Sequence, residues 1–366
     1  MAGKKKKRFV RNKKTVLRVS RKSSDEKNIR KVFFNPRDFN ENRPSKSKVK
    51  EYSDKLNLVK KEISKAVIGQ DMVVSSLLRA LIANGHVLVE GVPGIAKTLI
   101  IRILSEVSGN DVKRIQFTVD LLPTDIVGLT FYRESGSGGS FEVVKGPIFA
   151  NFLIADEINR SPPKTQSALL EAMQEKQVTI GRETFKLPNP FFVMATQNPL
   201  EQAGVYSLPE AQLDRFLFKL LIGYPKPGEE KLIMDCNIDL NKVEDFNLKK
   251  VISPKIIIEM QNVVKQVYLG DKVKDYIIDI VGKTRSKDRS YSKYIEWGVS
   301  PRASIGLYIA SKAEALMQGR NYVRPQDVKV VAKDILRHRI ILSYEAEAEK
   351  ITPDKIIDKI LDETPS

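Results

Sequence analysis

A run of eight residues with two glycines, a lysine and a threonine carries the clearest chemistry in this sequence. Gly91-Val92-Pro93-Gly94-Ile95-Ala96-Lys97-Thr98 fits the phosphate-binding pattern G-x-x-x-x-G-K-S/T, except that Ala96 replaces the second glycine. Small residues let successive backbone N–H groups close around a β-phosphate, and the methyl of Ala96 tightens this loop without excluding it. Lys97 supplies charge for the β- and γ-phosphates, and the Thr98 hydroxyl is suited to ligate Mg²⁺. The run therefore predicts a site for nucleotide phosphates and Mg²⁺.

Two carboxylates follow an apolar run that is typical of a buried strand. The strand covers residues 152–155, and Asp156 and Glu157 come at its carboxyl end. Asp156 can hold Mg²⁺ through water, and Glu157 can polarise an attacking water. An acidic pair after a strand is also common as a helix cap or a surface feature. The position of the pair, 59 residues after Lys97 at the end of a strand of the same sheet, favours the catalytic interpretation.

Alternating strands and helices must position these two motifs. Helical spacing of apolar residues predicts two helices within 55–84, divided at 68–70, and a third helix at 98–107 directly after the phosphate-binding loop. The predicted strands cover residues 86–89, 114–118, 152–155, 191–196 and 216–221. This alternation predicts an α/β fold with a mostly parallel sheet covered by helices on both faces.

The strand pattern stops near residue 228, and amphipathic helices follow. They include 254–268, 273–283 and 301–318. Two prolines and a glycine at 225–228 break regular structure and mark a hinge. We therefore expect four parts, namely a disordered basic tail at 1–48, a nucleotide-binding core at 49–224, the hinge at 225–228 and a helical domain at 229–366.

The formal net charge of +17 belongs almost entirely to the N-terminus. Residues 1–50 hold 19 Lys+Arg against 4 Asp+Glu, whereas the other 316 residues hold 43 against 41. The tail has too few apolar residues to offset the entropy of ordering it, so we expect it to be disordered. It is either a solvated segment with no dedicated partner or a non-specific anchor for nucleic acid or anionic lipid.

Other features exclude several classes of protein. A single cysteine rules out an internal disulfide, and two histidines far apart in the sequence argue against a His-based metal site. The chain has no apolar run of the roughly 18–20 residues that a membrane-spanning helix needs. The basic N-terminus also lacks the apolar region of a secretory signal. We expect a cytoplasmic protein with no transmembrane segment.

Longer motifs resemble those of the AAA+ ATPases and, more specifically, the MoxR family. The AAA+ motifs are the loop at 91–98, Asp-Glu-Ile-Asn-Arg at 156–160 and Ala-Thr-Gln-Asn-Pro at 195–199. Residues 164–173 and 208–216 resemble MoxR sequences in particular, and the whole resemblance covers about residues 50–362. It implies an AAA+ P-loop αβα core with a parallel sheet, followed by an all-helical lid domain. It also implies hydrolysis of ATP to ADP and phosphate with Mg²⁺, and a homo-oligomeric ring, for which we expect six subunits.

The resemblance also assigns roles to three polar residues. Asn198 matches sensor 1, although an Asn capping the turn before Pro199 would look the same locally. Arg215 matches the arginine finger that reaches the neighbouring subunit's nucleotide, and the alternative is a surface arginine paired with Asp214. Arg302 matches sensor 2 in the lid.

Local helix signals add one observation about Arg302. Ser300 and Pro301 are typical of an N-cap and a first helical position, which places Arg302 in the first turn. A cation there opposes the helix dipole, and a phosphate contact would explain it. Ile68 and Gly69 match the family's adenine-side element, although a plain helix break would look identical.

Two segments match the family's insertions. Residues 129–144 predict a hairpin whose tip at 135–139 is rich in Gly and Ser, and residues 178–185 predict a second hairpin. Ordinary surface hairpins would give the same patterns.

The resemblance implies a chaperone-like remodelling or maturation factor, often with a partner that bears a von Willebrand factor A domain. The alternative is a nucleic-acid-directed AAA+ motor that uses the basic tail. A motor needs basic residues in its pore, and residues 51–366 carry a net charge of only +2, which favours the remodelling factor.

Overall fold

The computed structural model describes residues 43–92, 94, 97–135, 138–199, 205–237 and 243–365. Every described residue belongs to one compact unit, Arg43–Ser366. The predicted basic tail therefore lies outside the described residues up to residue 42. Helix α3 (Lys46–Ile63) begins three residues before the predicted start of the nucleotide-binding core.

Five parallel strands form the central sheet, in the order β2-β5-β8-β1-β9. They are β1 (Val87–Gly91), β2 (Val112–Gln116), β5 (Phe152–Asp156), β8 (Phe192–Gln197) and β9 (Phe218–Ile222). All five predicted strands are confirmed, each within two residues of its predicted bounds. Because every strand runs in the same direction, the residues that follow β1, β5 and β8 meet at one edge of the sheet, which we call the carboxyl edge.

Side chains of the strands alternate between two apolar clusters, one on each face of the sheet. Phe152 and Ile154 pack with α3, α4 (Asp71–Ile82) and α5 (Lys97–Ser108) on one face. Leu153 and Ala155 pack with the helix after β5 on the opposite face. The helices of this second face are α6 (Pro123–Val127), α7 (Pro163–Glu175) and the short α8 (Glu210–Leu213). The prediction that helices cover both faces is therefore confirmed.

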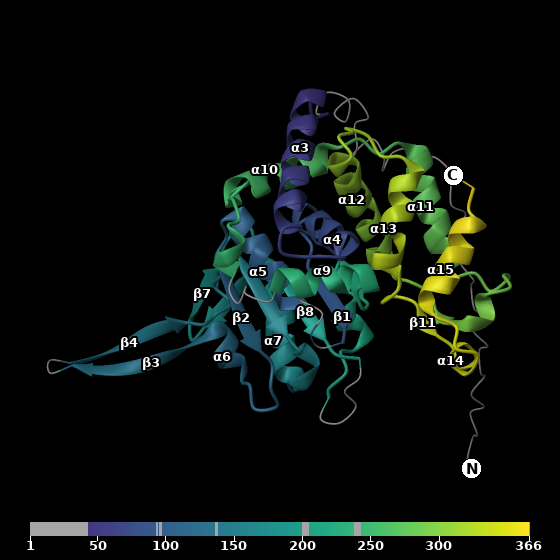
Figure 1. Cartoon of the computed structure of the whole chain (residues 1–366). Coiled ribbons are helices and arrows are strands. Elements are labelled where there is room, and N and C mark those ends of the chain that lie inside the picture. The colour runs from purple at the N-terminus through teal and green to yellow at the C-terminus, as the bar shows by residue number, and fades with distance from the viewer. Residues whose placement is uncertain are drawn as a thin grey trace, which may run out of the picture. The chain divides into compact units, whose positions relative to one another are not determined.

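Both predicted hairpins are present. The first, β3 (Gly128–Ser135) and β4 (Gly138–Lys145), extends away from the sheet (Figure 1), and its tip residues 136–137 lie outside the described residues. Gly128 has a φ of +105°, and a Cβ there would lie 2.2 Å from the carbonyl oxygen of Val144, so this corner requires glycine. The second hairpin consists of β6 (Gln177–Ile180) and β7 (Glu183–Lys186).

The segment after β9 is helical, as predicted, but it contains more elements than the sequence pattern indicated. Its helices are α9 (Pro227–Asn237), α10 (Pro254–Gln266), α11 (Asp271–Lys283), α12 (Pro301–Met317), α13 (Pro325–Leu336), α14 (Tyr344–Ala348) and α15 (Pro353–Asp362). A small antiparallel sheet, β10 (Ile295–Trp297) and β11 (Ile341–Leu342), was not predicted because strands of two or three residues leave no periodicity. The second half of the predicted hinge lies in the first turn of α9, and the domain boundaries stay predictions.

Helices α3 and α4 join the lid to the sheet. Ser53 of α3 donates a hydrogen bond of 2.7 Å to the carbonyl of Met317, and Gln261 of α10 donates one of 2.9 Å to the carbonyl of Leu81. Arg79 of α4 forms a buried ion pair with Glu314 of α12. In the described part of the chain, no helix is both long enough and apolar enough to cross a bilayer.

Both histidines are buried beside the segment that leads into β9. His86 Nδ1 accepts a hydrogen bond of 3.1 Å from Val193 N, and His338 Nε2 lies 3.1 Å from the carbonyl oxygen of Phe216. Burial lowers the pKa of His86 to about 4, and it lowers the pKa of His338 well below its ordinary value. Both imidazoles are therefore neutral in the folded protein at pH 7.

We expect the free energy of unfolding to fall as the pH drops from 6.5 toward 4. In this range the unfolded histidines bind protons and the folded ones do not, so acid favours the unfolded state. For His86 the change is on the order of 3 kcal/mol, because each pKa unit corresponds to about 1.4 kcal/mol. Urea unfolding at several pH values measures it, with His86→Gln as the control that should have a flatter pH dependence. An identical pH dependence in the two proteins would contradict the prediction.

Candidate nucleotide site

The phosphate-binding loop lies between the end of β1 and the start of α5. Gly94 has a φ of +82°, which favours glycine, and a Cβ placed there would meet nothing within 4 Å. Lys97 Nζ donates a hydrogen bond of 2.6 Å to the carbonyl of Gly91, so the ammonium group lies over the loop. Lys97 and Thr98 occupy the first turn of α5, whose N–H groups make this end of the helix positive. The predicted loop residues Pro93, Ile95 and Ala96 lie outside the described residues, and Val92 directly follows β1.

Asp156 is the last residue of β5, and its side chain is nearly buried. Its Oδ1 accepts a hydrogen bond of 2.5 Å from the Thr196 hydroxyl. Its Oδ2 accepts two hydrogen bonds from Arg114 at the end of β2, 3.0 Å from Nε and 2.6 Å from Nη2. The carboxylate predicted to serve Mg²⁺ is thus oriented by a hydroxyl and balanced by a guanidinium group.

Glu157 turns the chain sharply after β5. Its φ of +56° is uncommon for a residue other than glycine, and its N–H donates a hydrogen bond of 3.0 Å to the Thr196 hydroxyl. The carboxylate accepts hydrogen bonds of 2.8 Å from Gln116 Nε2 and 2.9 Å from Arg160 Nη1. Thr196 and Arg160 belong to motifs noted in the sequence, whereas Arg114 and Gln116, which also hold these carboxylates, were not singled out there. The end of β2 could have been suspected, because its carboxyl end must lie on the same edge of a parallel sheet.

Asn198 directly follows β8, the strand between β5 and β1. The register pairs Gln197 with Glu90, so Asn198 lies at the level of Gly91, where the phosphate-binding loop begins. Asn198 is buried, with 6% of its surface exposed. The carboxyl edge thus brings together the loop, both carboxylates and Asn198, as the sequence predicted.

The residues predicted to bind magnesium fit that ion. Mg²⁺ is usually held by one or two carboxylates together with substrate phosphates and waters, rather than by a cage of protein ligands. Asp156 and Thr98 supply one carboxylate and one hydroxyl at the carboxyl edge. Within the described ranges, no group of three or more His, Cys, Asp or Glu residues could hold a metal by itself. The donor set suits a magnesium ion that arrives with a nucleotide.

Ile68 and Gly69 link α3 to α4 beside the start of α9. Gly69 has a φ of +75°, and a Cβ there would lie 2.5 Å from Glu229 Oε2. This contact places the link against the first turn of α9. Its predicted role on the adenine side of a nucleotide stays a prediction.

Arg215 lies at the opposite edge of the sheet, which we call the amino edge. The backbone N–H of Leu217 donates a 2.8 Å hydrogen bond to the carbonyl of His86, the residue before β1. Strand β9 then runs alongside β1 from Phe218 to Ile222, which is level with Gly91. At about 3.3 Å per residue, the length of β1 separates Arg215 from the phosphate-binding loop by roughly 13 Å.

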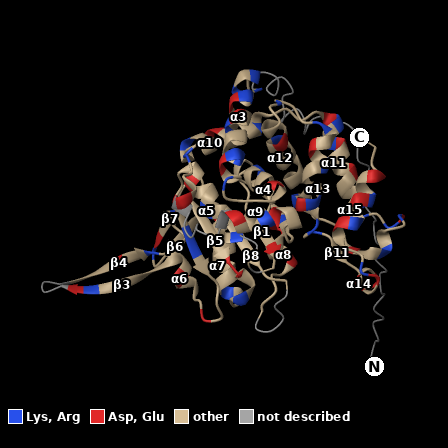
Figure 2. Ribbon diagram, viewed as in Figure 1, with Lys and Arg blue, Asp and Glu red and all other residues tan. Residues whose placement is uncertain are grey.

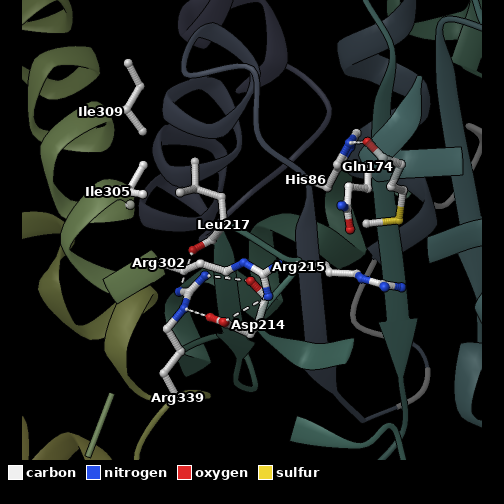
Figure 3. Close-up of a pocket in the computed structure, with 11 residues that line it drawn as sticks. His86, Gln174, Asp214, Arg215, Leu217, Arg302, Ile305, Ile309 and Arg339 are labelled. Carbon is white, nitrogen blue, oxygen red and sulfur yellow. Dashed lines mark hydrogen bonds and ion pairs between the residues drawn. The ribbon is translucent and has the colours of Figure 1, made fainter. Parts of the chain in front are cut away.

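Arg302 joins Arg215 at the amino edge rather than the loop of its own chain. It lies in the first turn of α12, as predicted, and its Nη1 is 3.4 Å from Asp214 Oδ2. Both arginines line one pocket of about 390 Å³ between α12 and the start of β9 (Figure 3). His86, Leu217 and Ile305 also line this pocket.

The suggested pairing of Arg215 with Asp214 is wrong. Asp214 instead pairs with Arg302 and Arg339, at 3.4 and 2.6 Å. The Arg215 side chain extends away from Asp214 (Figure 3), and its guanidinium group forms no hydrogen bond or ion pair with another described residue. It is only partly buried, so it can contact a group from outside this chain.

Comparisons with known proteins agree with this geometry. Residues 86–218 match the family model described as "ATPase family associated with various cellular activities (AAA)", and residues 289–360 match the AAA lid domain. The chain is 46% identical over 304 residues to Chaperone MoxR1 of Mycobacterium tuberculosis, covering 82% of this chain and 79% of that protein. It is also 46% identical over 299 residues to YeaC of Bacillus subtilis, covering 82% and 91%.

A solved structure has the same fold. It is the crystal structure of a "putative ATPase" from Cytophaga hutchinsonii, with a TM-score of 0.79 and 45% sequence identity. The match covers 87% of this chain and 97% of that one. An αβα core with a parallel sheet, a helical lid and 46% identity to Chaperone MoxR1 lead to one assignment. The chain belongs to the MoxR family of AAA+ ATPases.

Proposed function

We propose that the protein hydrolyses ATP at the interfaces of a homo-oligomeric ring and uses the energy to remodel or mature other proteins. The observation that carries this proposal is the division of the candidate site between two edges of one sheet. Groups that can bind phosphate lie on the carboxyl edge, and Arg215 and Arg302 lie on the amino edge. A complete site then needs two copies of the chain, and six copies in the ring would match the sequence-based expectation.

The carboxyl edge binds the nucleotide in this proposal. The backbone of residues 91–96 and the N-terminus of α5 surround the β-phosphate, and Lys97 contacts the β- and γ-phosphates. Thr98 and Asp156 hold the magnesium ion, whose charge offsets that of the phosphates. Ile68 and Gly69 flank the adenine.

Glu157 and Asn198 act on the water that attacks the γ-phosphate. Asn198 orients this water, and Glu157 accepts its proton as the new O–P bond forms and ADP leaves. The Glu157 carboxylate accepts hydrogen bonds from Gln116 and Arg160. It must therefore exchange at least one of these hydrogen bonds for the water before it can act as a base.

The amino edge of the neighbouring subunit completes the site. Arg215 and Arg302 are both cations at this edge, and Arg215 has no partner among the described residues of its own chain. Directed at the γ-phosphate of the next subunit, they stabilise the charge that develops during transfer. An arginine supplied in this way can be worth ~10³–10⁵ in rate.

The remodelling role rests on the name of one relative and on the surface of the first hairpin. Chaperone MoxR1 is 46% identical to this chain. The hairpin exposes four large apolar or aromatic side chains, those of Leu129, Tyr132, Phe141 and Val144. Such a surface suits contact with a client protein or with a partner that bears a von Willebrand factor A domain. Basic and acidic residues are interspersed along the described elements (Figure 2), and residues 51–366 carry a net charge of only +2, which favours a remodelling factor over a nucleic-acid motor. The cytoplasmic location stays a prediction from the sequence.

We expect Lys97→Ala to abolish ATP binding, because it removes the side-chain charge that the loop offers to the β- and γ-phosphates. Glu157→Gln should instead bind ATP with near-normal affinity and lose turnover, because the amide cannot accept a proton. Calorimetry measures the affinity, and phosphate release measures the turnover. Unchanged affinity in Lys97→Ala would contradict the loop assignment, and normal turnover in Glu157→Gln would contradict the role of the base.

We expect Arg215→Ala to bind ATP and lose turnover, and to recover activity when mixed with Lys97→Ala. A mixed ring contains interfaces with an intact Lys97 on one side and an intact Arg215 on the other. At equal amounts, random assembly gives about one such interface in four, so up to about a quarter of the normal turnover should return. If neither mixing nor protein concentration changes turnover, Arg215 acts within its own subunit.

The basic tail should account for any binding of nucleic acid or anionic vesicles. A variant that lacks residues 1–42 loses 15 Lys+Arg and 4 Asp+Glu, a net charge of +11, and keeps the N-cap Ser45 of α3. Its ATPase activity should survive while polyanion binding falls. In the full chain such binding should weaken by ~10³–10⁵ between 50 and 200 mM salt if 6–10 phosphates are contacted.

Titrations of both proteins with DNA, RNA and vesicles at several salt concentrations test this expectation, alongside ATPase rates with and without nucleic acid. Full polyanion binding by the shortened chain would place the basic surface elsewhere. Strong stimulation of ATP hydrolysis by DNA or RNA would favour the motor over the remodelling factor.

A further inference from the structure

The Asp214 carboxylate is a point where the lid meets the core, directly beside Arg215 (Figure 3). Its Oδ2 accepts a hydrogen bond of 3.0 Å from the Ser300 hydroxyl and lies 3.4 Å from Arg302 Nη1. Its Oδ1 accepts a hydrogen bond of 2.6 Å from Arg339 Nε. The side chain is 14% exposed, so these contacts take up most of its surface.

On the lid side, the carboxylate fixes the start of α12. Ser300 is the N-cap of this helix, and its hydroxyl accepts a hydrogen bond of 3.2 Å from the backbone N–H of Arg302. The Asp214 carboxylate therefore holds both the cap and the guanidinium group of Arg302. A cation in the first turn is locally unfavourable, and the negative charge of Asp214 offsets that cost.

A second lid residue, Arg339, also pairs with Asp214, and the side chain of Arg339 is 4% exposed. The Arg339 guanidinium group also donates hydrogen bonds to the backbone carbonyls of Asp214 at 3.2 Å, Phe216 at 2.7 Å and Leu217 at 3.2 Å. These three carbonyls flank Arg215 on both sides. The backbone that carries Arg215 is therefore held by the lid.

We propose that Asp214 is a positioning residue that sets Arg215 and Arg302 at a fixed spacing, so that both reach one phosphate group of the neighbouring subunit. This inference rests on the proposed function, because it assumes that the two arginines act across an interface. Asp214 itself does not touch the nucleotide. Its effect is that the lid must be docked on the core before the two cations can act together.

A structural role alone would also make Asp214 sensitive to mutation, because Asp214→Asn leaves the buried Arg339 without its anionic partner. The chain offers a matched control at the same junction. Arg337 donates a hydrogen bond of 2.6 Å to the carbonyl of Lys219 in β9, and its Nε lies 2.9 Å from Asp354 Oδ1. Asp354→Asn removes a carboxylate from Arg337, a second arginine that ties the lid to β9. Neither Arg302 nor Asp214 is a hydrogen-bond or ion-pair partner of Asp354 among the described residues.

We expect Asp214→Asn to bind ATP normally and to lose on the order of 10²-fold in turnover, the cost of a misplacement of about 1 Å. Asp354→Asn should keep turnover within about twofold of the unmodified protein, with a smaller loss of thermal stability than Asp214→Asn, because Arg337 keeps the carboxylate of Asp334 at 2.9 Å. Asp214→Glu keeps the charge and should lose less turnover than Asp214→Asn. Turnover of Asp214→Asn within about twofold of the unmodified protein, or an equal loss in the Asp354→Asn control, would overturn the proposal.

Mixed assemblies distinguish positioning across an interface from an effect within one subunit. Lys97→Ala mixed with Asp214→Asn should recover activity, because some interfaces combine an intact Lys97 with an intact Asp214 of the neighbour. No recovery would show that Asp214 serves its own subunit's site and would overturn the proposal. Recovery in the mixture of Lys97→Ala with Arg215→Ala, measured in parallel, reports on the proposed function separately.

Hydrogen exchange gives a readout that does not depend on ATP hydrolysis. The backbone amides of residues 302–304 should exchange faster in Asp214→Asn than in Asp354→Asn, because only the first variant loses the carboxylate that holds the α12 cap. Equal protection of this helix start in all variants would overturn the proposal even if turnover falls. If the unmodified protein does not hydrolyse ATP, the proposed function fails, and the exchange result still shows whether Asp214 fixes the lid arginine.

Discussion

The parallel direction of the five central strands is the constraint on which the rest of this structure depends. Parallel strands place their carboxyl ends together, and this brings the loop after β1, the carboxylates after β5 and Asn198 after β8 to one edge. The same direction sends the residues that precede β9 to the opposite edge. A strand of five residues is too long for Arg215 to span while the sheet stays intact, so the fold separates the two halves of the candidate site.

The junction between core and lid is built from buried arginines rather than from apolar contacts alone. Arg339, Arg337 and Arg79 are each at most 10% exposed, and each pairs with at least one carboxylate. Removing one partner of such a pair costs far more than the pair contributes, because the remaining charge stays buried. The junction therefore favours the one arrangement of lid and core in which every buried arginine keeps its carboxylate. It resists small displacements of the lid, which suits a lid that carries Arg302.

Local patterns in the sequence were sufficient to predict the strands, the phosphate-binding loop and the polar residues that follow the strands, because each of these signals lies within a few neighbouring positions. The pairing of Asp214 with Arg302 and Arg339 joins residues that are 88 and 125 positions apart, so no local pattern contains it. The hydrogen bond from Gln116 to Glu157 depends on which strand neighbours β5, and the strand order is a property of the whole sheet. The short strands β10 and β11 were not predicted, because they form through tertiary pairing and have no periodic pattern in the sequence.

The two edges of the sheet are nevertheless connected within one chain. Glu90, the residue before Gly91 in β1, accepts hydrogen bonds of 2.7 Å from Gln197 and pairs at 2.7 Å with Lys219 of β9. Gln197 precedes Asn198, and the carbonyl of Lys219 accepts the hydrogen bond from Arg337 of the lid.

A chain of hydrogen bonds and one ion pair therefore joins Arg337 of the lid, through Lys219 in β9 and Glu90 in β1, to Gln197, the residue before Asn198. The lid also carries Arg302, and its Arg339 donates hydrogen bonds to the backbone on both sides of Arg215. The lid is thus bonded both to the strands that lead to the nucleotide edge of its own subunit and to the segment that holds the arginines of the amino edge.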